Sequence, residues 1–294
     1  MEMNYMEIIS IKNIGIQRVD GNTIADFSDT LSIEEPLEIR LSYGPEGERM
    51  QKSISVTMRT PGNDVELAIG FLFTEGIITS YQDVTAAYHT KMNCLSQKQN
   101  IVQIDLDENF SPNLMQTDRN FYTTSSCGVC GKSSIQSIKT VSSFKDSAKP
   151  FLSIDPDIFY QLPKKLRLAQ SDFSATGGLH ASGIFTVEGD LLFLSEDVGR
   201  HNALDKLIGS ALIENTLPLN QHILLLSGRA SFELIQKAAM AGISVIASIG
   251  APSSLAVELA QEFDITLLGF LKKDRFNLYH SSDKVIIKTL QNQL

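Results

Sequence analysis

The last third of the chain alternates short, continuously apolar runs with segments of helical character. The apolar runs are ILLLS, SVIASI and ITLLGFL, and helices are expected at about residues 232 to 241 and 255 to 263. Strands that are apolar on both faces and alternate with helices are typical of βαβ units, whose parallel sheet is covered on both sides. The alternation therefore predicts an α/β fold.

The segments that follow these three runs are rich in glycine and polar residues. They are SGRAS (Ser227 to Ser231), GAPSS (Gly250 to Ser254) and FLKKDR (Phe270 to Arg275). In open α/β sheets, ligands collect beyond the carboxyl ends of the parallel strands. The sequence thus predicts that these segments lie together at one edge of the sheet and form a ligand site there.

The first third of the chain has a different character. Residues 36–43 and 52–60 alternate apolar and polar side chains, as half-buried strands do, and a helix with one apolar face follows the Pro61–Gly62 turn. We predict a smaller, strand-rich N-terminal α+β subdomain over residues 1–117 and an α/β domain over residues 118–294.

Three local signals organise the middle of the chain. Ser133 and Gln136 match a capping box, so a helix should begin just after Lys132. The run GIFTVEGDLLFLS indicates a hairpin that turns at Glu188-Gly189-Asp190. Asn202 is expected to cap a third helix, which carries an apolar stripe.

Composition narrows the class of protein. The formal charge is −9 with lysine and arginine dispersed along the chain, which argues against a broad nucleic-acid surface. No apolar run reaches the roughly 18 residues of a membrane span, and the N-terminus carries no signal-peptide pattern. We therefore expect a cytoplasmic protein with no nucleic-acid or membrane partner.

Two of the three cysteines, Cys127 and Cys130, lie in the run TTSSCGVCGK. An odd number of cysteines does not make a disulfide framework, and Cys94 has no companion and is interpreted as a packing residue. A zinc site would need further ligands, and the His-x-Glu of the zinc deaminases is missing. A thioredoxin-like dithiol would need a strand before Cys127, where the run is polar.

Sulfur transfer is the interpretation that the residues favour, without excluding the other two. A sulfur-carrying thiol must be exposed and partly ionised, and it must reach two partners in turn. Gly128 and Gly131 give a loop of small side chains, while Lys132 and the start of the expected helix favour thiolate over thiol. Cys130 could assist release of the sulfur or guard the carrier, and its attack on the persulfide would expel sulfide and leave a Cys127–Cys130 disulfide.

Five motifs, in order along most of the chain, resemble the FdhD family of formate dehydrogenase accessory sulfurtransferases. They are RTPGND (59–64), SSCGVCGK (125–132), ATGGLHAS (175–182), SEDVGRHNALDKLIG (195–209) and SGRASFELIQKAAMAGI (227–243). The resemblance implies a cytidine-deaminase-like three-layer sandwich with the added N-terminal subdomain. It also implies a persulfide carrier that takes sulfur from a cysteine desulfurase.

The resemblance further implies the sulfur acceptor and the site residues. The acceptor would be the molybdenum (or tungsten) bis-molybdopterin guanine dinucleotide cofactor, before its insertion into formate dehydrogenase. Cys127 would carry the persulfide with Cys130 as its companion. The cofactor-contacting segment would be Phe270, Leu271, Lys272, Lys273, Asp274 and Arg275, in which Lys273-Asp274 stands where family members more often have glycines. No intrinsic metal is expected, and the chain is expected to form a homodimer.

Several other polar residues have open roles. A hydrogen-bonded structural role and a role beside the ligand are both consistent with His180, Arg200, His201 and Arg229, whereas His89, His222 and His280 are interpreted as structural. The competing functional class is a zinc-dependent deaminase-like or nucleotide-binding module with metal-holding or redox cysteines. Stoichiometric zinc in the purified protein would favour that class.

Overall fold

A computed structural model describes residues 10–90, 100–114, 144 and 149–288. The predictions for Cys94, Cys127, Cys130 and the helix after Lys132 fall outside these residues. Within the described ranges, no helix combines the length and apolar character needed to cross a membrane.

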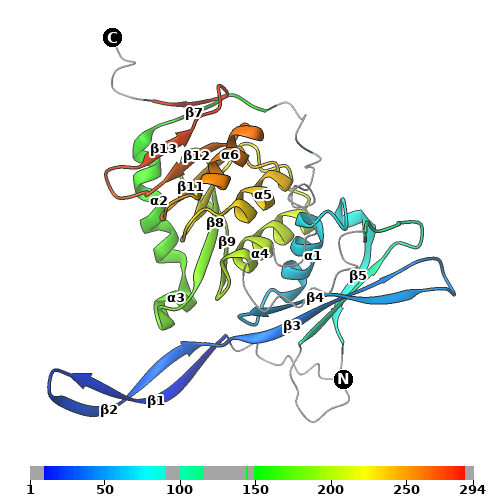
Figure 1. The fold of residues 1–294 in the computed structure, drawn as a ribbon, viewed down its shortest axis with the longest axis horizontal. Helices are drawn as coiled ribbons and strands as arrows, with labels where there is room; N and C mark the ends of the chain where they lie inside the picture. The colour runs from blue at the N-terminus through cyan, green and yellow to red at the C-terminus, as the bar shows by residue number, and fades with distance from the viewer. Residues whose placement is uncertain (1–9, 91–99, 115–143, 145–148, 289–294) are drawn as a thin grey trace.

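A six-stranded mixed sheet forms the centre of the C-terminal part (Figure 1). Its strand order is β13 (Asn277–His280), β12 (Thr266–Gly269), β11 (Val245–Ser248), β10 (Ile223–Leu226), β8 (His180–Phe185) and β9 (Leu191–Asp197). Strands β10, β11 and β12 are parallel, while β8 and β13 run antiparallel to their neighbours. The predicted α/β class and the hairpin of β8 and β9 are confirmed.

Helices cover both faces of this sheet because the strand residues alternate between two hydrophobic clusters. Leu224 and Ile246 face a cluster with α4 (Arg200–Ile213), α5 (Phe232–Met240) and α6 (Ser254–Glu262). Ile223 and Val245 face a second cluster with α2 (Pro156–Ala169), which α3 (Ser171–Thr176) follows. A two-stranded parallel ribbon of β7 (Leu152–Ile154) and β14 (Val285–Ile287) adds to the second cluster.

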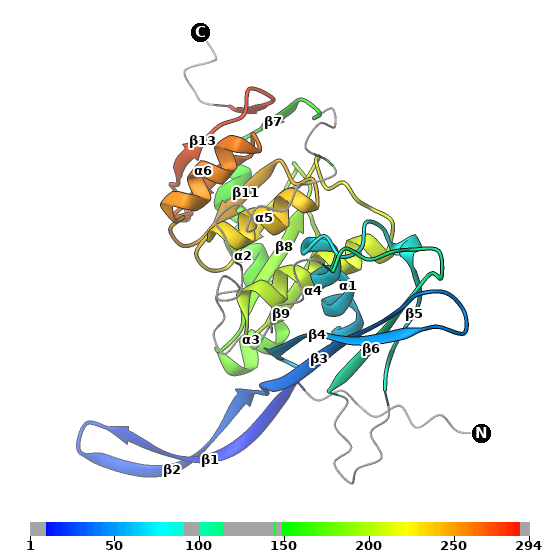
Figure 2. The same ribbon diagram turned by 45° about the vertical axis from the view of Figure 1, so that its right-hand side comes forward.

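The N-terminal part contains a four-stranded sheet and one α-helix. The strand order is β4 (Met50–Arg59), β3 (Glu35–Tyr43), β6 (Ile101–Leu106) and β5 (Val84–His89), with a 3-10 turn at Tyr81–Asp83. Helix α1 (Asp64–Thr74) packs between this sheet and α4, so one hydrophobic cluster continues through both parts of the molecule (Figure 2). The subdomain boundary near residue 117 lies outside the described residues and stays a prediction.

Helices α1 and α4 cross at two glycines. A Cβ atom on Gly70 would lie 1.9 Å from the backbone oxygen of Asp205, and one on Gly209 would lie 1.9 Å from that of Glu66. Any larger residue would overlap the facing backbone, so the glycines set how closely the two helices approach.

One element of the fold was not predicted from the sequence. Strands β1 (Ile11–Asp20) and β2 (Thr23–Ser32) form a two-stranded antiparallel hairpin that projects from the body of the molecule (Figure 1, Figure 2). We call this hairpin the arm. It hydrogen-bonds to neither of the larger sheets.

The predicted cap of α4 is wrong by about one turn. Gly199 is the N-cap and the helix begins at Arg200, while Asn202 lies within the first turn. The side-chain amide of Asn202 instead donates hydrogen bonds to the backbone oxygen of Met58 at 2.8 Å and to Asp197 Oδ1 at 3.1 Å. Asparagine is favoured at helix starts, which is why Asn202 was predicted to be the cap. Its contacts are tertiary, and a local sequence pattern does not reveal them.

Candidate functional site

The three segments that follow the parallel strands lie side by side. The backbone nitrogen of Gly250 donates to the oxygen of Gly228 at 2.9 Å, and that of Phe270 donates to the oxygen of Gly250 at 3.0 Å. Residues 227–231, 250–254 and 270–275 thus form one continuous polar edge, which we call the carboxyl edge. The predicted juxtaposition of these segments is confirmed.

Small residues make this close stacking possible. A Cβ atom on Gly250 would lie 2.9 Å from Cγ of Arg229, and one on Gly269 would lie 2.7 Å from Cδ of Pro252. Larger residues at these positions would push the loops apart. The glycines therefore keep the carboxyl edge compact.

Residues 270–275, predicted to contact the cofactor, form an exposed turn closed by a 2.8 Å hydrogen bond from the nitrogen of Lys272 to the oxygen of Arg275. Phe270 is 44% exposed and has a φ of 52°, a left-handed conformation that is unfavourable for residues other than glycine. Leu271 is buried in the second cluster. A ligand on this turn would meet the other five side chains and only the backbone of Leu271. The assignment itself stays a prediction.

His180 also lies at the carboxyl edge, because its strand runs antiparallel to β10. It is the first residue of the antiparallel strand β8, and its ring packs against Gly228, where an added Cβ atom would lie 3.4 Å from the ring. It also pairs in register with Asp197, the last residue of β9. Burial lowers the pKa of His180, and the positive charges of Arg200 and His201 lower this pKa further, whereas Asp197 opposes the shift.

The first turn of α4 is tied to the start of α5. His201 Nε2 lies 2.9 Å from Glu233 Oε2 and 3.4 Å from the hydroxyl of Ser231, which is the N-cap of α5. The Nε atom of Arg200 is buried without a hydrogen-bond partner among the described residues. Arg229 is exposed two residues before that N-cap. The structure thus brings His180, Arg200, His201 and Arg229 to the same end of the sheet.

Glu196 and Asp197, the two carboxylates that precede Arg200 in the sequence, make contacts with other residues. Glu196 accepts hydrogen bonds from the side chain of Gln170 and from the backbone nitrogens of Asp172 and Phe173. Its role is to hold the start of α3. Asp197 is fully buried and has a larger set of contacts.

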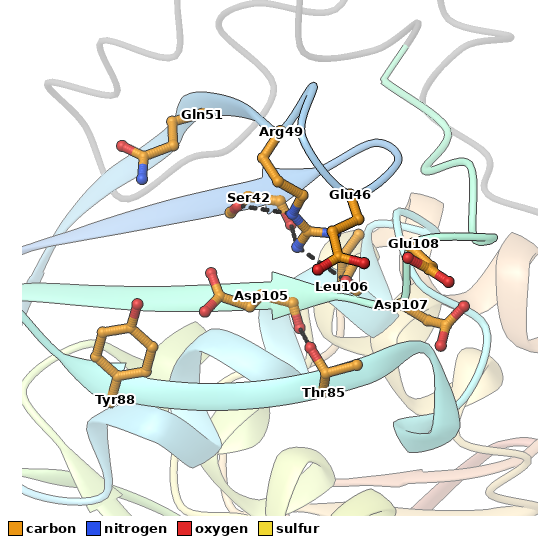
Figure 3. Close-up of a pocket in the computed structure, with 10 residues that line it drawn as sticks. All are labelled: Ser42, Glu46, Arg49, Gln51, Thr85, Tyr88, Asp105, Leu106, Asp107 and Glu108. Atoms are coloured by element: carbon orange, nitrogen blue, oxygen red, sulfur yellow. Dashed lines mark hydrogen bonds between the residues drawn. The ribbon is translucent and has the colours of Figure 1, made fainter.

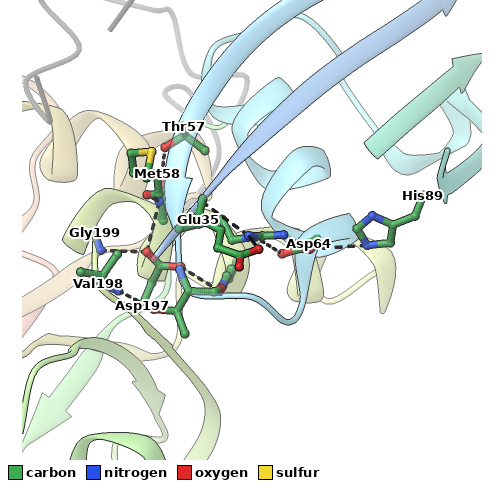
Figure 4. A network of polar contacts seen from close by, with 12 residues as sticks. Glu35, Thr57, Met58, Asp64, His89, Asp197, Val198 and Gly199 are labelled. Carbon is green, nitrogen blue, oxygen red and sulfur yellow. Dashed lines mark hydrogen bonds and ion pairs between the residues drawn. The ribbon is translucent and has the colours of Figure 1, made fainter. Parts of the chain in front are cut away.

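Asp197 connects the N-terminal sheet to the start of α4 (Figure 4). Its carboxylate lies 2.8 Å from Lys206 Nζ and accepts hydrogen bonds from the backbone nitrogens of Gly199 at 2.8 Å and Thr60 at 3.1 Å. Lys206 also donates to the oxygen of Thr60 at 2.8 Å. The network fixes the loop that carries Arg200 and His201.

A second ion pair lies in the same region of Figure 4. Arg59 donates to both carboxylate oxygens of Asp64, at 2.9 Å each, and His89 Nε2 lies 3.4 Å from Asp64 Oδ2. The interpretation of His89 as a structural residue fits this position, but its carboxylate neighbour was not anticipated. The RTPGND and SEDVGRHNALDKLIG motifs meet in space through the contacts of Thr60 with Asp197 and Lys206.

The buried charges of this region were not predicted from the sequence. Asp205 and Lys206 sit within a helix whose other residues are mostly apolar and buried. Charged residues among buried apolar residues are rarely left unpaired. The position of Asp205 and Lys206 in an apolar helix was therefore a sequence signal for buried ion pairs.

A separate depression of about 600 Å³ lies on the N-terminal sheet (Figure 3). It is lined by Ser42, Glu46, Arg49, Gln51, Thr85, Tyr88, Asp105, Leu106, Asp107 and Glu108. The guanidinium of Arg49 donates to the backbone oxygens of Ser42, Gly44 and Leu106, so it holds loops together. None of the predicted site residues that the structure describes lines this depression.

The position of His180 gives a testable pH dependence. We expect its pKa, followed by NMR titration of the ring protons, to lie below that of an unperturbed histidine, so that the ring is neutral at pH 7. An Arg200→Gln variant removes one positive neighbour and should raise this pKa. As a control, Lys164→Gln, on helix α2, should leave it unchanged. A pKa that falls or stays constant in Arg200→Gln would contradict the described geometry.

Together, the mixed sheet and its carboxyl edge define an α/β protein whose cationic and histidine side chains gather at the strand ends, beside the loops. Comparison with known proteins then places the chain more narrowly. The model of the FdhD/NarQ family matches residues 33–286, and the chain belongs to this family.

Relatives in bacteria and archaea match over nearly their full length. The sulfur carrier protein FdhD of Mycolicibacterium paratuberculosis is 46% identical over 87% of this chain and 92% of its own. The proteins of the same name from Streptomyces coelicolor and Sulfurisphaera tokodaii are 43% and 37% identical, over 94% and 95% of this chain and 96% and 100% of their own.

One solved structure shares the fold. A crystal structure named as that of a formate dehydrogenase accessory protein, from Desulfotalea psychrophila, superposes with a TM-score of 0.68 over 95% of this chain and 100% of its own. The two sequences are 19% identical, so the likeness concerns the fold alone.

Proposed function

We propose that this protein is a sulfur carrier required for formate dehydrogenase activity, with Cys127 as the sulfur-carrying residue. Family membership and relatives named sulfur carrier protein FdhD support the carrier role. The residues around Cys127 support the choice of atom, since glycines and a neighbouring lysine favour an accessible thiolate.

The chemistry begins with a cysteine desulfurase that holds a persulfide. The thiolate of Cys127 attacks the terminal sulfur of that persulfide, forms a new S–S bond and releases the thiolate of the desulfurase. Cys127 then holds the sulfur as Cys–S–SH. Attack of Cys130 on the inner sulfur would expel the terminal sulfur as sulfide and leave a Cys127–Cys130 disulfide.

The acceptor in this proposal is the molybdenum bis-molybdopterin guanine dinucleotide cofactor, bound as a substrate at the carboxyl edge. The observation that carries this part is the convergence of residues 227–231, 250–254 and 270–275 on one edge. Lys272, Lys273 and Arg275 are exposed on the turn, and Arg229 is exposed beside it. Cationic side chains of this kind suit the phosphates of a dinucleotide.

The remaining parts of the proposal concern setting and assembly. We place the protein in the cytoplasm, with a cysteine desulfurase as sulfur donor, formate dehydrogenase as recipient of the cofactor and a second copy of the chain as a homodimer partner. We also propose a cytidine-deaminase-like sandwich, for which the central sheet with helices on both faces is the support.

The test is formate dehydrogenase activity in cells that carry Cys127→Ala as the only copy of the gene. We expect activity to fall to the level of cells that lack the protein, because alanine cannot hold a sulfur atom. The matched control is Cys94→Ala, which should keep activity near the wild-type level. Activity retained in Cys127→Ala would contradict the proposal and favour a chaperone that only holds the cofactor.

A further inference from the structure

The arm has one apolar face and one polar face. In its regular antiparallel register, Ile16 lies opposite Phe27, and residues directly opposite each other point to the same side. Ile14, Ile16, Ala25, Phe27 and Leu31 therefore share one side, which we call the apolar face. The guanidinium of Arg18 lies 4.4 Å from the centre of the Phe27 ring, which is consistent with a common side.

The other side of the arm is polar in its middle, and its apolar residues are at the two ends, Ile11 at the base and the Val19–Ile24 pair beside the turn. Gln17 donates to Asp26 at 3.3 Å and Thr30 donates to Asn13 at 2.7 Å across the strands. The alternation of apolar and polar positions is the pattern of a strand pair with one buried side. Two strands exposed to solvent on both sides would not require this alternation.

The apolar face lies outside the hydrophobic core of the described residues. Neither hydrophobic cluster includes a side chain of the arm, and Phe27 and Leu31 are 46% and 43% exposed. The arm reaches outward, and only its base approaches the body, near α3 (Figure 1, Figure 2). An isolated two-stranded hairpin is marginally stable in water, so this ribbon needs a partner surface.

We infer that the apolar face binds the same face of a second copy of the chain, with the two arms antiparallel. The charged residues on this face favour a second copy of the chain as the partner and an antiparallel orientation of the two arms. On this face, Arg18 belongs to the next residue pair toward the tip from the Ile16–Phe27 pair, and Asp29 belongs to the next pair toward the base. Asp20 belongs to the second pair toward the tip, and Lys12 belongs to the second pair toward the base.

A two-fold axis across the Ile16–Phe27 pair exchanges tip and base. It brings Arg18 of each copy to the level of Asp29 of the other, and Lys12 to the level of Asp20. Parallel arms would place like charges at the same level instead. The face is therefore complementary to itself in the antiparallel arrangement, as an isologous interface requires.

This inference specifies the surface for the proposed association of two copies and is independent of the sulfur chemistry. It is tested by the mass of the full-length protein in solution, measured by analytical ultracentrifugation, which does not involve Cys127. We expect a dimer. Phe27→Lys should raise the dimer dissociation constant by about 100-fold or more, because a charge would be buried at the centre of the interface. The matched control is Ser28→Lys, which puts the same charge on the polar side and should change the constant by less than about threefold.

Charge reversal separates a specific interface from a misfolded arm. Arg18→Glu and Asp29→Lys should each weaken the dimer by about tenfold, and the double variant should restore it to near the wild-type constant. A wild-type chain that is monomeric at about 100 μM overturns the inference. So does a dimer that Phe27→Lys leaves intact, or a double variant that shows no recovery.

Discussion

Replacing Lys237 with methionine is expected to lower the free energy of unfolding by about 3–5 kcal/mol. The Nζ atom of Lys237 lies 2.9 Å from both carboxylate oxygens of Asp205, 2.9 Å from the hydroxyl of Thr74 and 3.6 Å from Glu75 Oε1. Asp205 is 2% exposed. Removing the lysine leaves a buried carboxylate with no cation to balance it, and this desolvation is the source of the cost.

Chemical denaturation of three variants measures this effect. Lys237→Met should be strongly destabilised, whereas the double variant Asp205→Leu, Lys237→Met should recover most of the loss because the buried carboxylate is removed together with its cation. The matched control is Arg40→Met, whose partner Glu38 lies in a half-exposed pair, and it should cost less than about 1 kcal/mol. Equal losses in Lys237→Met and Arg40→Met would contradict the burial of the pair.

The Gly209→Ala variant is expected to lose about 3 kcal/mol or more, a fall of about 6 °C or more in the melting temperature. The added Cβ would lie 1.9 Å from the backbone oxygen of Glu66 on α1. Neither helix can yield without displacing the core that joins the N-terminal sheet to α4. Alanine otherwise favours a helix, so the loss would come from the crossing and not from helix propensity.

Thermal unfolding monitored by circular dichroism checks this result. The matched control is Ser210→Ala, at the next position of the same helix, where the side chain donates a hydrogen bond to the oxygen of Lys206 one turn earlier. It should shift the melting temperature by less than about 2 °C. A Gly209→Ala protein that melts with the wild type would mean that the two helices do not approach as closely as described.

The C-terminal fold was readable from the sequence because its signals are local. The composition of continuously apolar strands such as ILLLS distinguishes them from the helices between them. The order of these elements along the chain implies that the strands share one carboxyl edge. The edge strand β13 and the exact start of α4 were not readable. Asn202 shows why, since its partners Met58 and Asp197 are distant in sequence or depend on the fold.

The arm and the buried ion pairs could not be placed from local pattern alone. The alternation in residues 11–32 is interrupted by charged residues, so its apolar face becomes evident only when the register pairs Ile16 with Phe27. Likewise Asp205 and Lys237 come from different helices, and only packing brings them together. Sequence similarity identified the family, whereas the geometry supplied the contacts around His180 and Asp197.

The most direct test of the central claim is the mass of the intact protein after incubation with a cysteine desulfurase and cysteine. We expect the wild-type chain and Cys130→Ala each to gain about 32 Da, the mass of one sulfur atom, in a form that a thiol reductant removes. Cys127→Ala should gain nothing under the same conditions. A reductant-sensitive gain of the same size on Cys127→Ala would show that another residue carries the sulfur and would contradict the role of Cys127.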